Sequence, residues 1–181
     1  TALGKRKKET NRTFLIAAKK GNIDAVKKQL TLGANVNVSV WAKDPDGGIL
    51  DSYIGYTALQ FAINEGDMEM LELLVGEGAD VNVKTPNFQE FPVLYQAVTA
   101  PKNRKEIVEL LLSNGAEVNA RWKFGDTALY EAVQYTDNIE IIKLLLAKGA
   151  DVNDSVGLNY SPFEKALRGV EACEKDMDRA K

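Results

Sequence analysis

The chain has 181 residues, a formal net charge of −3, one cysteine and no histidine. Without histidine it lacks the commonest general base, the commonest zinc ligand and every Ser-His or Cys-His nucleophile pair, and neither common glycine-rich phosphate loop is present. No apolar run approaches the roughly 20 residues that span a membrane, and a single cysteine favours a reducing compartment. We therefore expect no catalytic residue, no cofactor and no metal.

The first twelve residues are basic and polar, with a Lys-Arg-Lys-Lys run at 5–8 and no apolar core of the kind that a secretory signal needs. Such runs usually lie in a solvated tail, which is our prediction here. A nuclear-import or anionic-surface motif is the alternative. No aromatic residues accompany the run for base stacking, so we expect no nucleic-acid binding.

Beyond this run, apolar segments come in pairs that predict two helices per unit. In the clearest unit Thr57 opens an inner helix that ends at Gly66, and Asp67 caps an outer helix over 68–76 with a broad apolar face. Gly78 then stands where a helix can end in the left-handed conformation. The other predicted pairs are 14–18 with 25–32, 93–98 with 107–112 and 128–133 with 141–146, the third outer helix beginning with a capping-box-like 103–106. A fifth unit starts at 161–163.

The segment Gly-Ala-Asx/Glx-Val-Asn follows each of the four complete pairs, with spacings of 45, 37 and 34 residues. A period in this range is typical of a stacked repeat protein, in which a unit completes its core only against its neighbours. The four copies are residues 33–37, 78–82, 115–119 and 149–153.

These units resemble ankyrin repeats. The family's Thr-Pro-Leu-His-x-Ala opening is matched in part at 57–62, 127–132 and 161–166, and its Gly-Ala-Asp-Val-Asn close is matched by the four segments above. The resemblance implies an all-α ankyrin-repeat solenoid, made of helix-turn-helix repeats with β-hairpin-like finger connectors. The predicted organisation is a single domain over 1–181, with repeats at about 10–37, 57–82, 92–119 and 127–153, a partial capping repeat at 161–178 and an extended finger at 38–56.

The chain departs from the family at the histidine of the opening, which normally supports hydrogen bonds between neighbouring loops. Gln60, Tyr95, Tyr130 and Glu164 stand there, so other groups must make these bonds or fewer are made. Pro92 replaces the expected threonine.

The last unit lacks the leucine stripe after residue 168 and is heavily charged, which is typical of a cap that shields the end of a stack. A boundary inside a longer protein is the alternative. We expect Cys173 to be a structural apolar residue, since no activating base is in sight.

The first connector carries about a dozen residues more than the last one. Alternating residues at 38–43 and 49–54 flank a turn-rich centre at 44–48, which predicts an elongated β-hairpin. A tolerated surface insertion is the alternative, but Trp41 on this finger favours a role in binding.

In the ankyrin family, connector tips and the exposed ends of the inner helices line a concave face. Carried over by register, this face holds a series of aromatic residues, which are enriched in binding hot spots. Sideways packing is an equal alternative for Tyr56, Phe91 and Phe124, whereas Trp41 and Trp122 are expected to contact a partner. The expected partner-binding residues are Trp41, Tyr53, Ile54, Tyr56, Asn64, Glu65, Phe88, Gln89, Phe91, Trp122, Lys123, Phe124, Asp126, Gln134, Tyr135, Leu158 and Tyr160.

The resemblance thus implies a non-enzymatic module that binds a protein partner through its concave face and finger loops, as a monomer in the cytoplasm or nucleus and not on a membrane. Three alternatives stay open: a recognition domain of a larger effector or enzyme, an inhibitor or immunity protein that blocks its target with the first finger, and an enzyme built on two carboxylates. The last would need two converging acids, and we expect the acidic residues at turns, helix starts and outer helix faces.

Overall fold

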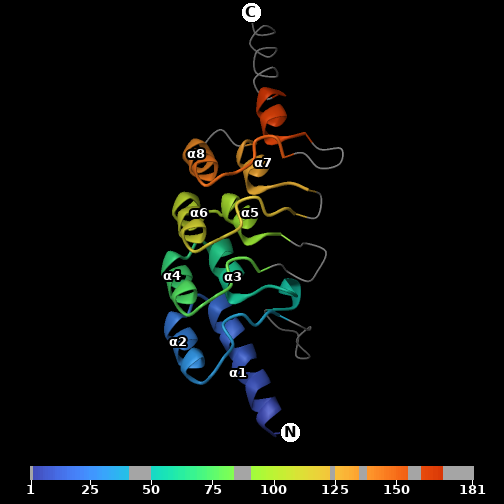
Figure 1. The fold of residues 1–181 in the computed structure, drawn as a ribbon. Helices are drawn as coiled ribbons and strands as arrows, with labels where there is room; N and C mark the ends of the chain where they lie inside the picture. Colours follow the sequence, from blue (N-terminus) through green and yellow to red (C-terminus); the bar gives the residue numbers. More distant parts are fainter. Residues whose placement is uncertain are drawn as a thin grey trace, which may run out of the picture.

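The computed structural model describes residues 2–40, 50–83, 91–122, 125–134, 138–154 and 160–168. Helices pair along the chain and form two parallel columns, with the connectors extending from the inner column (Figure 1). The inner helices are α1 (Ala2–Lys19), α3 (Ala58–Glu65), α5 (Val93–Val98) and α7 (Ala128–Ala132), and the outer helices are α2 (Ile23–Thr31), α4 (Met68–Gly76), α6 (Arg104–Ser113) and α8 (Ile139–Ala147). Residues 162–168 are also helical. The predicted all-α solenoid is confirmed.

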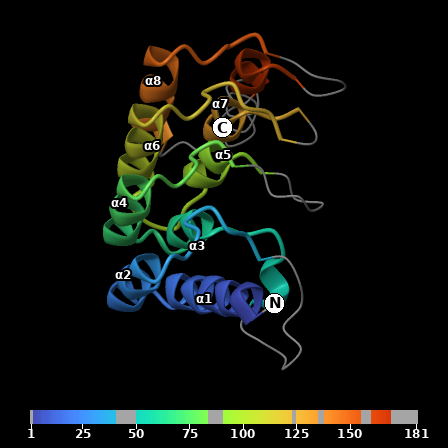
Figure 2. The ribbon, with the colours of Figure 1, turned by 60° about the horizontal axis from the view of Figure 1, so that its bottom comes forward.

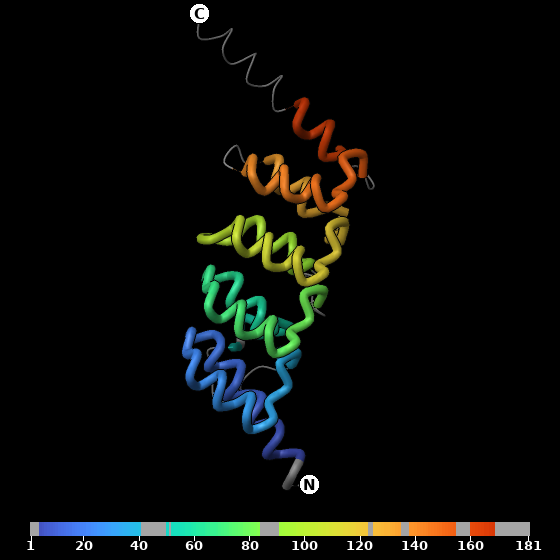
Figure 3. The backbone as a smooth tube through the Cα atoms, turned by 60° about the vertical axis from the view of Figure 1, so that its left-hand side comes forward, coloured from blue at the N-terminus to red at the C-terminus, as the bar shows by residue number. Residues whose placement is uncertain are grey.

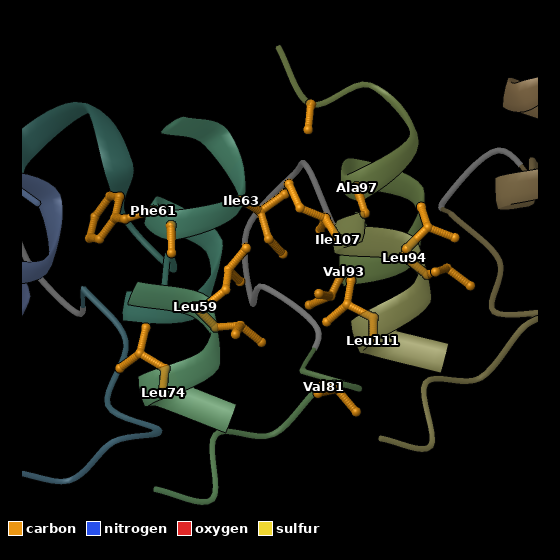
Figure 4. Close-up of a cluster of buried hydrophobic side chains, with 14 of the residues drawn as sticks. Leu59, Phe61, Ile63, Leu74, Val81, Val93, Leu94, Ala97, Ile107 and Leu111 are labelled. Carbon is orange, nitrogen blue, oxygen red and sulfur yellow. The ribbon is translucent and has the colours of Figure 1, made fainter. Parts of the chain in front are cut away.

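The core runs through the stack without a break between units, and the helix pairs follow one another from the N-terminal end to the C-terminal end (Figure 3). Between the second and third pairs, Leu59 and Ile63 of α3 face Val93 of α5, and Ile107 and Leu111 of α6 belong to the same buried layer (Figure 4). Burying one such side chain contributes roughly 1.5–3 kcal/mol. Since each layer draws side chains from two units, neighbouring units stabilise one another.

Short polar side chains cap the outer helices α2 and α4, and the cap at Asp67 is the predicted one. Asn22 Oδ1 accepts a hydrogen bond from the Ala25 N–H at 2.9 Å, and Asp67 Oδ1 accepts one from the Met70 N–H at 3.1 Å. Gly66 ends α3 with φ of +64°, a conformation that favours glycine. A Cβ at Gly66 would also lie 2.9 Å from Cβ of Lys102, so the next unit's approach depends on glycine here.

The predicted capping box at the start of α6 is wrong. Asn103 has a left-handed φ of 53° and makes no side-chain cap. Its Nδ2 instead donates to the Gly66 carbonyl at 2.9 Å, so this asparagine joins two units rather than capping its own helix.

The final asparagine of each of the first three repeated segments holds the next segment in the stack. Asn37 Oδ1 accepts from the Asp80 N–H at 2.7 Å, and its Nδ2 donates to the Gly78 carbonyl at 3.2 Å. Asn82 bonds Glu117 and Gly115 in the same way, and Asn119 bonds Asp151 and Gly149. The repeated motif therefore ties the exposed loop backbone of one unit to the asparagine side chain of the preceding unit.

The N-terminus differs from the prediction. The expected tail is the first half of α1, and its basic residues 5–8 are exposed. Lysine, arginine and glutamate are good helix formers, and a helix that has started at the buried segment 14–18 propagates at low cost.

The first connector is only partly hairpin-like. An antiparallel bridge joins Ser39 to Thr57, and the Val40 N–H donates to the Tyr56 carbonyl at 2.8 Å. The second strand predicted at 49–54 is wrong, because Asp51–Tyr53 forms a 3-10 helix, η1. Residues 41–49 lie outside the described residues, as do 169–181 with Cys173.

Candidate protein-binding surface

The C-terminal ends of the inner helices and the bases of the connectors form one side of the stack, which we call the inner face. Figure 2 shows the inner helices between the outer column and the connectors. Two groups of aromatic rings lie on this face, one at the base of the first connector and one at the bases of the second and third.

The first aromatic cluster consists of Tyr53, Tyr56 and Phe61. The Tyr53 ring meets the other two edge-on, with centroids 5.4 Å from Tyr56 and 5.3 Å from Phe61, and Tyr56 stacks on Phe61 at 5.7 Å. Phe61 is fully buried in α3, whereas both tyrosines are half-buried. The cluster therefore holds the base of the first connector against α3.

Lys19, at the end of α1, completes this cluster from the preceding unit. Its ammonium lies 4.7 Å from the Tyr53 ring centroid and 2.8 Å from Glu65 Oε1. The hydrogen bond to Glu65 raises the pKa of Lys19 above its ordinary value, against the opposing effect of burial. The lysine is thus protonated at neutral pH and links α1, the first connector and α3.

The second aromatic cluster consists of Phe91, Tyr95 and Trp122. Phe91 and Trp122 stack with centroids 4.6 Å apart, and Tyr95 lies 5.6 Å from each of them. Phe91 and Trp122 are half-buried. The three rings come from two successive units, so this cluster bridges repeats on a partly exposed surface.

Glu131 lies beneath the second cluster and was missed by the sequence analysis. It lies in the first turn of the inner helix α7, where an acid was expected, but only 8% of the residue is exposed, and this burial was not predicted. The Tyr95 hydroxyl donates to Glu131 Oε2 at 2.9 Å, and Gln134 Nε2 donates to the same oxygen at 2.8 Å. A buried carboxylate is stable only with such donors.

The sequence does hold a signal for Glu131. It occupies the same repeat register as Phe61 in the second unit and Gln96 in the third, both of which are buried. Gln96 likewise bonds across units, since its Nε2 donates to the Gln60 carbonyl at 3.3 Å and to Asn64 Oδ1. Tyr95 and Gln96 thus make hydrogen bonds between units in a chain that lacks the histidine of the family's opening motif.

The inner face continues toward the C-terminal end. The Lys165 ammonium lies 5.7 Å from the Tyr130 ring centroid, and the Arg168 guanidinium lies 3.8 Å from that of Tyr160. Burial, followed by the negative charge of Asp126, raises the pKa of Tyr130. Cation–π pairs therefore recur on this face at both ends of the stack.

The structure places the predicted residues of the described ranges on or next to this face. Tyr53, Ile54, Tyr56, Asn64, Phe91, Trp122 and Asp126 are half-buried, and Glu65, Gln134 and Tyr160 are exposed. Tyr56 and Phe91 pack against neighbouring rings, and Trp122, expected to contact a partner, stacks on Phe91. The predicted residues outside the described ranges are Trp41, Phe88, Gln89, Lys123, Phe124, Tyr135 and Leu158.

In the described part of the chain, no helix is both long and apolar enough to cross a membrane. The same residues contain no group of three or more His, Cys, Asp or Glu side chains that could hold a metal ion.

Comparison with known proteins gives the class of protein. A family model described as ankyrin repeats (3 copies) matches residues 14–122 and 86–156. The chain is 36% identical over 85 residues to human Ankyrin repeat and SOCS box protein 6, which covers 47% of this chain and 20% of that protein. It is 36% identical over 81 residues to the mouse B-cell lymphoma 3 protein homolog, covering 45% and 17%, and 35% identical over 90 residues to Serine/threonine-protein kinase 12 of Arabidopsis thaliana, covering 50% and 18%.

The chain belongs to the ankyrin-repeat family. Domains of this family are generally protein–protein interaction modules and are typically non-enzymatic. The chain spans about a fifth of the length of the relatives named above, which share only a repeat region with it.

Proposed function

We propose that the chain is a single ankyrin-repeat domain that binds a protein partner through its inner face, either alone or as the recognition part of a longer protein. The observation that carries this proposal is the second aromatic cluster, in which Phe91 and Trp122 stack across two units and keep part of their surface exposed. Rigid aromatic residues backed by a fixed scaffold are the commonest source of binding energy at protein interfaces.

The surroundings of the cluster support this proposal. Thr99 and Gln134, at the ends of α5 and α7, are exposed, and Gln134 shares its Glu131 oxygen with Tyr95 of the cluster. Tyr95 is fixed from below by its hydrogen bond to Glu131, so the rings need little reordering on binding. Binding to a preorganised surface loses less conformational entropy, which favours affinity.

The test is affinity capture with mass spectrometry, using an inner-face variant with Thr99→Arg and Gln134→Arg. Two bulky cations at exposed positions should exclude the partner, and an arginine at position 134 can still donate to Glu131 in place of the Gln134 amide. The matched control places the same two cations on the outer helices, with Ser113→Arg on α6 and Leu146→Arg on α8, since both positions are exposed.

We expect one set of captured proteins to be retained by the wild-type chain and the control and to be lost from the inner-face variant. Circular dichroism should show the same helix content in all three. Capture that survives the inner-face change but fails with the outer-helix change would place the interface on the opposite column and refute the proposal.

A second candidate function is a protein inhibitor that inserts its first connector into a target. The observation in its favour is the anchoring of that connector's base, where the Gly55 N–H donates to the Val40 carbonyl at 2.6 Å beside the first aromatic cluster and Lys19. A long loop on a rigid base suits insertion into a concave site. Deletion of residues 44–48 should abolish inhibition of a captured enzyme while leaving the melting temperature nearly unchanged, and inhibition that persists would exclude this candidate.

A further inference from the structure

Positive charge is concentrated at the N-terminal end of the stack. Residues 4–32 contain nine lysines and arginines against two acids, Glu9 and Asp24, while the rest of the chain has 14 basic and 24 acidic residues. The excess lies on α1 and α2. Such an asymmetry produces a local positive potential that the net charge of −3 conceals.

The length of α1 places much of this charge beyond the rest of the stack. The helix has 18 residues, whereas α3, α5 and α7 have between 5 and 8. Its N-terminal turns run past α2 toward the side of the connectors (Figure 2). Residues 4–9 on these turns are exposed.

These turns form one wall of an open groove, which we call the basic groove. It is lined by Arg6, Lys7 and Thr10 of α1 and by Leu32 and Gly33 after α2. Leu32 is 61% exposed, so a large apolar side chain stands opposite two cations.

The two walls of the basic groove are tied together. Asn11 Oδ1 accepts a hydrogen bond from the Asn35 N–H at 2.9 Å, which fixes α1 to the loop after α2. The Thr10 hydroxyl donates to the Arg6 carbonyl at 3.0 Å, one turn earlier on α1. The groove therefore exists before any ligand arrives, which reduces the entropy cost of binding.

We propose that the basic groove binds an acidic peptide segment of a partner protein, with carboxylates on Arg6 and Lys7 and an apolar side chain on Leu32. Guanidinium and ammonium groups bind carboxylates through charge-assisted hydrogen bonds. The exposed leucine adds apolar contact that a purely ionic site would lack. This surface is separate from the inner face and extends the function beyond it.

A membrane surface fits the observations less well. Residues 4–13 contain no large apolar side chain, whereas a helix that lies in a membrane interface needs an apolar face along its length. Leu32 stands on the far wall of the groove, where a flat bilayer would not reach it together with Arg6 and Lys7.

The test is fluorescence anisotropy with the full chain and a labelled synthetic peptide, Glu-Glu-Leu-Glu-Glu-Leu-Glu-Glu, at physiological ionic strength. The groove variant carries Arg6→Glu and Lys7→Glu, and the matched control carries Lys27→Glu and Lys28→Glu, which are exposed on α2 and do not line the groove. Both variants change the net charge equally. Acids in the first turns of α1 also suit its helix dipole, so the groove variant is expected to fold.

We expect the groove variant to bind the peptide about tenfold more weakly and the control to stay within about twofold of wild type, because the groove changes replace two attractive charge pairs with repulsive ones. Leu32→Ser should weaken binding about fivefold, from the loss of apolar contact. A glutamine version of the peptide should not bind. The inner-face variant Thr99→Arg with Gln134→Arg should bind the acidic peptide as wild type does, so failure of one proposal leaves the other testable.

Three results would overturn the proposal. One is an equal loss of peptide binding in the groove variant and the Lys27/Lys28 control. Another is cosedimentation with phosphatidylserine vesicles, abolished by the groove changes, in the absence of peptide binding. The third is self-association in sedimentation velocity that the same changes remove, which would make a second copy of the chain the occupant.

Discussion

The two aromatic clusters occupy similar places in successive repeats, yet they are built in opposite ways. In the first cluster Phe61 is buried in the core, and a cation, Lys19, lies over the outermost ring. In the second cluster the stacked rings of Phe91 and Trp122 lie on the outside, and the charged group, Glu131, is buried beneath them. Each cluster thus has one buried ring and two half-buried rings, and the two differ in where the charged group lies, over the rings in the first cluster and beneath them in the second.

The difference arises from the opening residues of the two units. In the second unit Thr57 and Gln60 form a capping box, in which the Gln60 side chain bonds back to its own helix start. In the third unit Pro92 stands in place of the threonine and makes no side-chain cap. Tyr95, at the position of Gln60, instead extends outward to the Phe91 and Trp122 rings and bonds Glu131 of the next unit.

The largest expected effect on stability compares a fully buried ring of the first cluster with a half-buried ring of the second. Phe61→Ala should lower the free energy of unfolding by about 3–5 kcal/mol, because it removes a fully buried ring. Phe91→Ala should cost about 1–2 kcal/mol, since its ring is half-buried. Urea unfolding followed by circular dichroism measures both, and equal losses would contradict the difference in construction.

The next effect concerns the buried carboxylate. Tyr95→Phe should cost about 1–3 kcal/mol, because it removes a donor to Glu131. Tyr130→Phe, at the same register in the next unit, is the matched control and should change the free energy of unfolding by less than about 0.5 kcal/mol. A Tyr95→Phe variant as stable as this control would show that Glu131 does not depend on the tyrosine.

A smaller effect tests the capping box at the start of the second unit, which the third unit lacks. Thr57→Ala should lower the free energy of unfolding by about 1 kcal/mol, the usual value of an N-cap. Thr99→Ala removes the hydroxyl of an exposed threonine that caps no helix start and should be nearly neutral. If the two substitutions cost the same in thermal melts, the capping box would not account for the ordered start of α3.

The smallest effect is pH-dependent. The pKa of Lys19 is raised, mainly by its hydrogen bond to Glu65, so the pair stabilises the fold fully below the ordinary lysine value of 10.5 and loses this stabilisation as the pH rises through the raised value. Glu65 has 55% of its side chain exposed, so the contribution is at most about 0.5 kcal/mol. In urea unfolding at neutral pH, the free energy of unfolding of the wild type should exceed that of Glu65→Gln. This difference should disappear in strongly alkaline buffer. A stability difference that grows as the pH rises would contradict the predicted direction of the pH dependence.

The sequence predicts the stack of helix pairs well because the signals for each helix lie within a few residues of one another. Apolar periodicity marks the paired helices, and Gly66 and Gly78 both adopt the left-handed conformation that the pattern requires. The N-terminal half of α1 escapes prediction because it contacts little core, so residues 5–8 show no apolar stripe even though they propagate a helix.

The construction of the inner face is harder to predict because its contacts are not local. Tyr95 and Glu131 are separated by 36 positions, and Asn103 gives up its own helix cap for a carbonyl in the preceding unit. The residue types at the inner face follow from register, but whether a ring anchors a connector or remains exposed depends on how the neighbouring connector packs.

The central claim is that a protein partner binds the inner face. Hydrogen–deuterium exchange of the chain, alone and in complex with its captured partner, tests this claim directly. We predict slower exchange at 91–99 and 128–134 on partner binding, with α4, α6 and α8 unchanged. Protection confined to the outer helices, with 91–99 and 128–134 unaffected, would contradict the account.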